Sequence, residues 1–160
     1  MTAPAPDLPR LRDAAVLHHR AGRLAEAERL YRQALALDPG HADSLNLLGV
    51  LAQQSGRTGL ALDLLGQAIA RDPAVAGYHA NLGNMLGEAG RLDEAVASFG
   101  RALALDPTQP EAHSNLAHAL AQLGRLDEAI ACCRAALALR PGFAQALHNL
   151  GNLLWQAGGL

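Results

Sequence analysis

The sequence predicts an all-α protein in which helix–turn–helix repeats stack into an α-solenoid. Ala and Leu contribute 34 and 31 of its 160 residues, and both residue types favour helices. Prolines recur every 34 residues, at Pro39, Pro73, Pro107 and Pro141. Val, Ile and Thr together number only nine, whereas an all-β fold needs many β-branched residues.

Other positions share the 34-residue interval, so an internal repeat is the strongest signal in the sequence. Small residues form series in phase with the prolines: Gly22, Gly56, Gly90, Gly124 and Gly158; Ala27, Ala61, Ala95 and Ala129; Ala34, Ala68, Ala102 and Ala136. This phase predicts repeats at residues 8–41, 42–75, 76–109 and 110–143, a partial fifth repeat at 144–160, and a flexible N-terminal tail at 1–7.

Each repeat is expected to begin with a helix that ends near its glycine. In the second repeat, Leu45, Leu48 and Ala52 have the spacing of one helix face. Gly56 then supplies the left-handed backbone residue with which helices commonly end. The same reasoning applies to Gly90 and to the equivalent glycine of the fourth repeat.

A second helix is predicted after each glycine, for example over residues 92–105. Asp93 and Glu94 fall in its first turn, where carboxylates interact favourably with the helix dipole. Asp106 and Pro107 end it, because proline disfavours a helical residue before it and lacks an N–H donor. The loops are a few residues long, so neighbouring helices are expected to be antiparallel.

The two helices of the third repeat are expected to pack closely. Gly83 and Ala95 allow the helices to approach, and Phe99 fills the space beside them. One such hairpin buries too little apolar surface to be stable alone, so the repeats are expected to stack. The last helix then keeps an uncovered apolar face, formed by Leu147, Leu150 and Leu154.

Composition excludes several classes of function. The net charge is −2 and all 13 cationic residues are Arg, so we expect no surface for nucleic acid or an anionic membrane. No apolar run reaches the roughly 18 residues of a membrane span, and residues 1–9 lack the pattern of a secretory signal. The adjacent Cys132 and Cys133 cannot form a disulfide framework. A cytoplasmic location is therefore predicted, and the Ala, Arg and Gly content indicates a bacterial source.

No residue pattern points to catalysis, a cofactor or a metal site. His79 and His113 occupy equivalent places one repeat apart, too far to share an ion whose metal–nitrogen distances are about 2 Å. Cys133 takes the large-residue place of Phe99 and is expected in the core, with Cys132 more exposed. The sequence contains no phosphate-binding loop and no nucleophile motif. We therefore predict a binding protein and not an enzyme.

A row of arginines follows the turn glycines, at Arg23, Arg57, Arg91 and Arg125. Such a row could bind an acidic partner. The alternative is a solvated edge whose guanidinium groups pair with nearby Glu and Asp side chains. We favour the second interpretation.

Stacked hairpins curve, so their first helices are expected to line a concave groove. Asn81, Asn115 and Asn149 share one groove position in the last three repeats, where the first two carry Asp13 and Leu47. An Asn amide can pair with a peptide N–H and C=O together. Alternatively, these amides solvate the groove or bond to adjacent helices. Neighbouring groove residues are expected to be Asn84, His118, Gln122, Asn152 and Trp155.

The repeat length and these residues resemble the tetratricopeptide repeat family, from about Leu8 to the end of the chain. The resemblance implies a right-handed solenoid whose groove cradles an extended peptide. The segments His79–Gly83 and Ala112–Ala117 are similar to the asparagine ladder in the tetratricopeptide region of O-GlcNAc transferases. Chaperone-binding members place cations in the groove, whereas this chain has Asp43, Gly77 and Glu111 at such positions.

The predicted function is a protein-interaction module that holds an extended segment of a partner protein. A second hypothesis is a substrate-recruiting region of a larger bacterial glycosyltransferase similar to O-GlcNAc transferases, which depends on the resemblance alone. A third is a scaffold that assembles head-to-tail through the open helix at 144–157.

Overall fold

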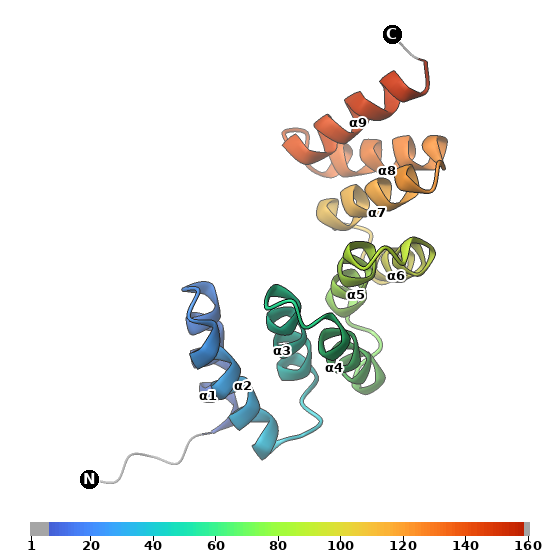
Figure 1. Cartoon of the computed structure of the whole chain (residues 1–160). Helices are drawn as coiled ribbons and strands as arrows, with labels where there is room; N and C mark the ends of the chain where they lie inside the picture. Colours follow the sequence, from blue (N-terminus) through green and yellow to red (C-terminus); the bar gives the residue numbers. More distant parts are fainter. Residues whose placement is uncertain (1–6, 159–160) are drawn as a thin grey trace, which may run out of the picture. The chain divides into compact units, whose positions relative to one another are not determined.

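A computed structural model describes residues 7–158, and the described residues form nine α-helices in two compact units (Figure 1). The N-terminal unit, Met1–Pro73, contains α1 (Leu8–Arg20), α2 (Leu24–Leu37), α3 (Ala42–Gln54) and α4 (Thr58–Arg71). The C-terminal unit, Ala74–Leu160, contains α5 (Ala76–Glu88), α6 (Leu92–Leu105), α7 (Pro110–Gln122), α8 (Leu126–Leu139) and α9 (Ala144–Gln156).

Within each unit the helices pack in the order of the sequence. The pairs α1–α2, α3–α4, α5–α6 and α7–α8 are packed hairpins. In the C-terminal unit the first helices also touch one another, α7 contacting both α5 and α9. This sequential stacking is the arrangement of an α-solenoid, and the predicted all-α class is confirmed.

The described part of the chain begins at the N-cap of α1, and most of the predicted tail falls outside it. Residues 1–6 lie outside the described part of the chain. Asp7 is the N-cap of α1, and its Oδ1 accepts a hydrogen bond of 2.9 Å from the backbone N–H of Arg10. A side-chain bond of this kind satisfies one of the free N–H groups at a helix start.

A glycine follows the first helix of each repeat, as the repeat predicted, and four of these five glycines lie in the turn between the two helices of a hairpin. Gly22, Gly56, Gly90, Gly124 and Gly158 have φ between 73° and 76°. Residues with a β-carbon rarely adopt this left-handed conformation. The second helices end as expected too, since Asp106 after α6 has an extended backbone with φ −143°.

The close approach of α5 and α6 is confirmed. A β-carbon built on Gly83 would lie 2.7 Å from the Phe99 ring. Ala95 has no exposed surface and Phe99 is 2% exposed. In α3, a β-carbon on Gly49 would meet the Ala61 carbonyl oxygen at 3.2 Å. The small residues therefore set the distance between the helices of a hairpin.

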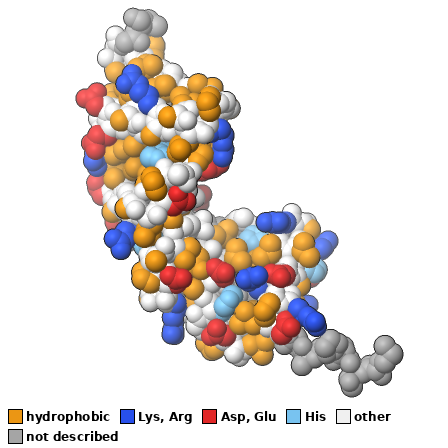
Figure 2. Space-filling view, turned by 180° about the vertical axis from the view of Figure 1, so that it is seen from behind, with side chains coloured by type: hydrophobic (Ala, Val, Ile, Leu, Met, Phe, Trp, Pro, Cys, Tyr) orange, Lys and Arg blue, Asp and Glu red, His pale blue; other side chains and the backbone are white. Residues whose placement is uncertain are grey.

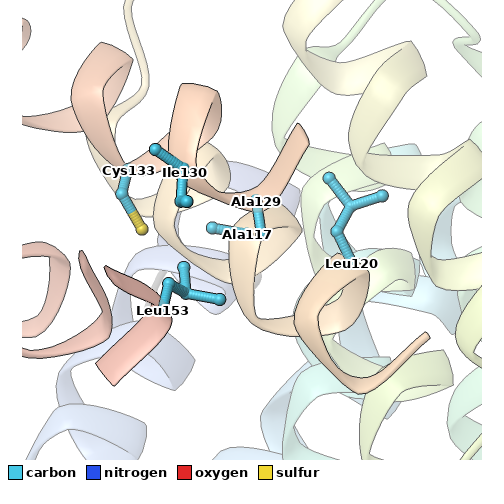
Figure 3. Packing of buried hydrophobic residues seen from close by; sticks show 6 residues of the cluster. All are labelled: Ala117, Leu120, Ala129, Ile130, Cys133 and Leu153. Atoms are coloured by element: carbon cyan, nitrogen blue, oxygen red, sulfur yellow. The ribbon is translucent and has the colours of Figure 1, made fainter. Parts of the chain in front are cut away.

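The core of the C-terminal unit continues between α7, α8 and α9 (Figure 3). Cys133 is fully buried there, as predicted, and Cys132 is only partly buried. Leu153 of α9 belongs to this cluster, and the Cys133 side chain points toward it (Figure 3). Burial raises the pKa of both thiols, which keeps them protonated at neutral pH and unsuited to act as nucleophiles.

The arginines after the turn glycines form ion pairs. Arg91 bonds Glu94, and Arg125 bonds Glu128, each through two hydrogen bonds of 2.7 Å. Arg57 of α4's N-cap reaches back to Glu28 of α2 at 2.9 and 2.7 Å. The interpretation of this row as a paired, solvated edge is confirmed for these three positions.

Glu28 makes the N-terminal unit sensitive to acid. Hydrogen bonds from Arg57 and then Arg32 lower the pKa of Glu28 from 4.5 to about 2. When the pKa of a carboxyl group is lower in the folded state than in the unfolded state, the group stabilises the fold at any pH above its unfolded-state pKa. This stabilisation is lost as the pH falls through the folded-state pKa. We expect Glu28→Gln to lower the free energy of unfolding at pH 7 by about 1 kcal/mol. The variant should also lose less stability than the wild type between pH 4.5 and about 2.

Urea denaturation followed by circular dichroism at several pH values tests this expectation. Glu26→Gln is the matched control, because Glu26 lies on the same helix and is exposed. Equal losses for the two variants at neutral pH would show that the Glu28 pairs contribute nothing specific.

Candidate peptide-binding face

Two neighbouring hollows lie on the first helices of the C-terminal unit. The hollow between α5 and α7 has a volume of about 350 Å³, and the hollow between α7 and α9 has a volume of about 340 Å³. His118 and Gln122 line both. We call this surface the amide face, defined by Asn84, Asn115, His118, Gln122, Asn149 and Asn152.

Each hollow has an apolar floor beneath a polar rim. The floor of the first includes Gly83, Gly87 and Phe99. The floor of the second includes Ala117 and Leu153. Because glycine and alanine project little side chain, the closely packed hairpins leave room for an incoming side chain above them. Asparagine, glutamine and histidine side chains surround this space.

Hydrogen bonds between amides connect the three first helices. Asn115 Nδ2 donates to Asn84 Oδ1 at 2.8 Å, and Gln145 Nε2 donates to Asn115 Oδ1 at 3.1 Å. Asn149 Nδ2 donates to Ser114 Oγ at 3.3 Å. The interpretation that these amides bond to adjacent helices is thus observed. An amide has two N–H donors and two oxygen lone pairs, so Asn115 retains one of each for a ligand.

His118 occupies the ridge shared by the two hollows. Its Nε2 lies 2.7 Å from Gln122 Nε2. Since an amide nitrogen only donates, the ring nitrogen accepts and the imidazole proton is placed on Nδ1. The ring therefore offers a donor as well as an aromatic face to a bound chain.

The structure brings together six of the eight residues that were predicted to line the groove. Asn81 lies half-buried on α5, and Trp155 is 71% exposed at the end of α9. Neither residue lines either of the two hollows described above. Sequence reasoning missed Gly87, Glu88 and Gln156, although each follows a predicted residue by one helical turn.

The amide face carries little charge. Glu88 is the one charged residue among those lining the first hollow, and none lines the second. On the face of the molecule shown in Figure 2, cationic and acidic side chains are interspersed. Long-range electrostatic attraction is consequently a poor basis for recognition here.

The histidines have structural partners. His41 caps α3 by accepting from the backbone N–H of Ser44 at 3.3 Å, a role that the sequence reasoning missed. His19 lies 3.3 Å from the Tyr31 hydroxyl and 2.9 Å from Gln54 Oε1. His113 Nε2 donates to the Pro107 carbonyl at 3.0 Å. Among the described residues, no three His, Cys, Asp or Glu side chains are grouped to hold a metal ion.

Sequence profiles of known families match most of the chain. A profile described as "Tetratricopeptide repeat" matches residues 18–84, one described as "TPR repeat" matches 83–124, and a second tetratricopeptide profile matches 110–143. The chain is a tetratricopeptide repeat protein. Repeats of this family are generally modules for protein–protein interaction. No curated protein sequence matches the chain significantly.

Several solved structures share this fold. A structure of MamA has a TM-score of 0.82 at 23% identity, covering 91% of this chain and 85% of its own. PilF of Pseudomonas aeruginosa has a TM-score of 0.87 at 25% identity, covering 94% and 71%. YrrB, described as "a TPR protein with an unusual peptide-binding site", has a TM-score of 0.79 at 25% identity, covering 96% and 79%.

None of these three structures is described as an O-GlcNAc transferase, so the similarity to the asparagine ladder of those enzymes stays a prediction. Among the helices of residues 7–158, none is both long and apolar enough to cross a membrane.

Proposed function

We propose that the amide face of the C-terminal unit binds an extended segment of a partner protein. The observation that carries this proposal is the pair of adjoining hollows that share His118 and Gln122. An extended chain spans them by placing alternate side chains over the apolar floors. The amides between the floors then pair with its backbone N–H and C=O groups.

Recognition through backbone amides predicts broad tolerance of partner sequence. The floors formed by Gly83, Gly87 and Phe99, and by Ala117 and Leu153, favour apolar side chains of modest size. The near absence of charge predicts affinity that changes little with salt, since screening acts on charged pairs. The peptide-binding site named for YrrB, a protein of the same fold, supports assigning this class of ligand.

Peptide binding can be tested without a known partner. Twelve-residue peptides selected from a random phage-display library are synthesised and titrated into the chain by isothermal calorimetry. We expect Asn115→Ala to weaken binding by about 1 kcal/mol for each hydrogen bond lost. Changing Asn84, Asn115 and Asn149 together should weaken it further.

Gln67→Ala is the matched control, because it removes an exposed amide on α4, outside the amide face. Selected peptides that bind the triple variant as tightly as the wild type would refute the proposal. So would an affinity that falls steeply between low and moderate salt, because it would indicate a charged site elsewhere.

A further inference from the structure

A third hollow lies in the N-terminal unit, between the first helices α1 and α3. Its volume is about 310 Å³, and it is lined by Val16, His19, Arg20, Tyr31, Leu47 and Gln54. Buried Tyr31 occupies the same repeat position as Phe99, which lines the hollow between α5 and α7. The two hollows are therefore equivalent sites in different repeats.

The walls of the two equivalent hollows differ in chemistry. Val16 and Leu47 occupy the repeat positions at which the hollow between α5 and α7 has Asn84 and Asn115. Both apolar side chains are partly buried. The amides that can pair with a peptide backbone in the C-terminal unit are thus replaced by walls that suit the apolar part of a side chain.

The charge of the hollow is reversed as well. Arg20 occupies the repeat position of Glu88, and no Asp or Glu is found among the described residues that line this hollow. Within residues 7–158 the exposed guanidinium group of Arg20 forms no ion pair and no hydrogen bond. Burial raises the pKa of Tyr31 to about 12, and the positive charge of Arg20 opposes this shift. The charge of Arg20 therefore acts on the hollow itself.

Hydrogen bonds join three residues of the hollow. His19 Nε2 donates to Gln54 Oε1 at 2.9 Å, because an amide oxygen only accepts. His19 Nδ1 then accepts from the Tyr31 hydroxyl at 3.3 Å. These bonds occupy both ring nitrogens and the Gln54 oxygen. In the part of the chain that the structure describes, the Gln54 NH2 group and the Arg20 guanidinium remain as donors, and both suit an anionic acceptor.

We propose that this hollow binds the side chain of a glutamate in a segment of a partner protein. The methylene groups of the glutamate lie against Val16 and Leu47, and its carboxylate accepts hydrogen bonds from Arg20 and Gln54. The carboxyl terminus of a chain fits less well, because the adjoining peptide groups would meet apolar walls without hydrogen-bond partners. This site is separate from the amide face and does not depend on it.

Small capped peptides test which charge the hollow recognises. The probe is a tripeptide with glutamate between two alanines, acetylated and amidated so that the glutamate carboxylate is its only charge. It is titrated into the nitrogen-15-labelled chain, and NMR follows the side-chain amide of Gln54 and the backbone amide of Leu47. We expect saturable shifts of both signals, with half-saturation at about 1 mM.

Two further peptides identify the chemical group that is bound. One has glutamine in place of the glutamate, which keeps the shape of the side chain and removes its charge. The other is acetylated trialanine with a free carboxyl terminus, which moves the carboxylate to the end of the chain. Each should bind at least about threefold more weakly than the glutamate probe.

Substitution of Arg20 tests its role directly. Arg20→Gln should weaken binding of the glutamate probe at least about threefold, and the chain should still fold because Arg20 is exposed at the end of α1. Arg29→Gln is the matched control, since Arg29 is exposed on α2 and does not line the hollow. Arg20→Glu gives this position the charge of Glu88 and should make the hollow prefer a tripeptide with lysine in place of the glutamate.

Four results would overturn the proposal. The first is the absence of saturable shifts up to about 10 mM probe. The second is equal binding of the glutamate and glutamine peptides. The third is an equal loss for Arg20→Gln and Arg29→Gln, which would indicate general attraction by positive charge. The fourth is tighter binding of the trialanine peptide, because the ligand would then be a chain terminus. Asn115→Ala should leave probe binding unchanged, which separates this test from that of the amide face.

Discussion

Replacing Tyr31 with alanine is expected to lower the free energy of unfolding by about 3–5 kcal/mol. Tyr31 lies on α2 with no exposed surface, and burial raises its pKa from 10.0 to about 12. Alanine removes the whole ring and leaves a cavity between the hairpins of the N-terminal unit. A loss of this size is a large share of the stability of a small domain. Urea denaturation followed by circular dichroism measures it.

Tyr31→Phe separates the ring from its hydroxyl group. The hydroxyl lies 3.3 Å from His19 Nδ1, a long and weak hydrogen bond. Phenylalanine keeps the ring, so we expect a loss of about 1 kcal/mol or less. Similar losses for the two variants would contradict the view that ring burial, rather than the polar contact, stabilises this position.

Gly83→Ala is expected to destabilise the chain by about 1–3 kcal/mol, although alanine is the better helix former. The added β-carbon would lie 2.7 Å from Cε1 and 2.9 Å from Cγ of Phe99. Because Cγ is fixed close to the backbone, the ring cannot swing aside without moving α6. The midpoint of urea denaturation should fall accordingly.

Gly100→Ala on α6 is the control for helix propensity. A β-carbon at Gly100 meets no atom within 4 Å, so this variant should gain up to about 1 kcal/mol. Combining Gly83→Ala with Phe99→Leu should recover part of the loss, because the smaller side chain relieves the contact. The decisive result is a loss of stability for Gly83→Ala together with a gain of stability for Gly100→Ala. A gain of stability at Gly83 would show that the hairpins are not in close contact there.

The sequence could predict the helices and their turns because both are encoded locally. The apolar spacing and the glycine at a fixed interval placed the second helix of the third repeat at residues 92–105, where α6 lies. The close pairing of Gly83 with Phe99 followed from the same phase, since small and large residues alternate at fixed positions. The buried place of Cys133 could be inferred from its equivalence to Phe99.

Side-chain partners were harder to predict, because they depend on rotamers and on distances between helices. The bond from Asn115 to Asn84 joins residues of two different repeats. So does the pair between Arg57 and Glu28. The repeat pattern shows which residues occupy equivalent positions in successive repeats. It does not show which neighbouring side chains those residues contact. For the same reason the sequence could not show which predicted groove residues line the two hollows, and Trp155, which is exposed on α9, lines neither of them.

The division of the chain into two compact units could not be predicted from the sequence either. The repeat phase runs through Pro73 and Ala74 without interruption, yet the boundary between the compact units falls at this point of the chain. Periodicity records the face that each helix buries, and it contains no measure of where the chain divides into compact units.

The recurrence of one turn conformation at Gly22, Gly56, Gly90, Gly124 and Gly158 has an evolutionary consequence. Duplication of a stretch of gene encoding 34 residues inserts a hairpin that already includes its own turn. Insertion of a single codon within a helix instead rotates all later side chains of that helix by about 100°. Homologous genes are therefore expected to differ in length by whole repeats.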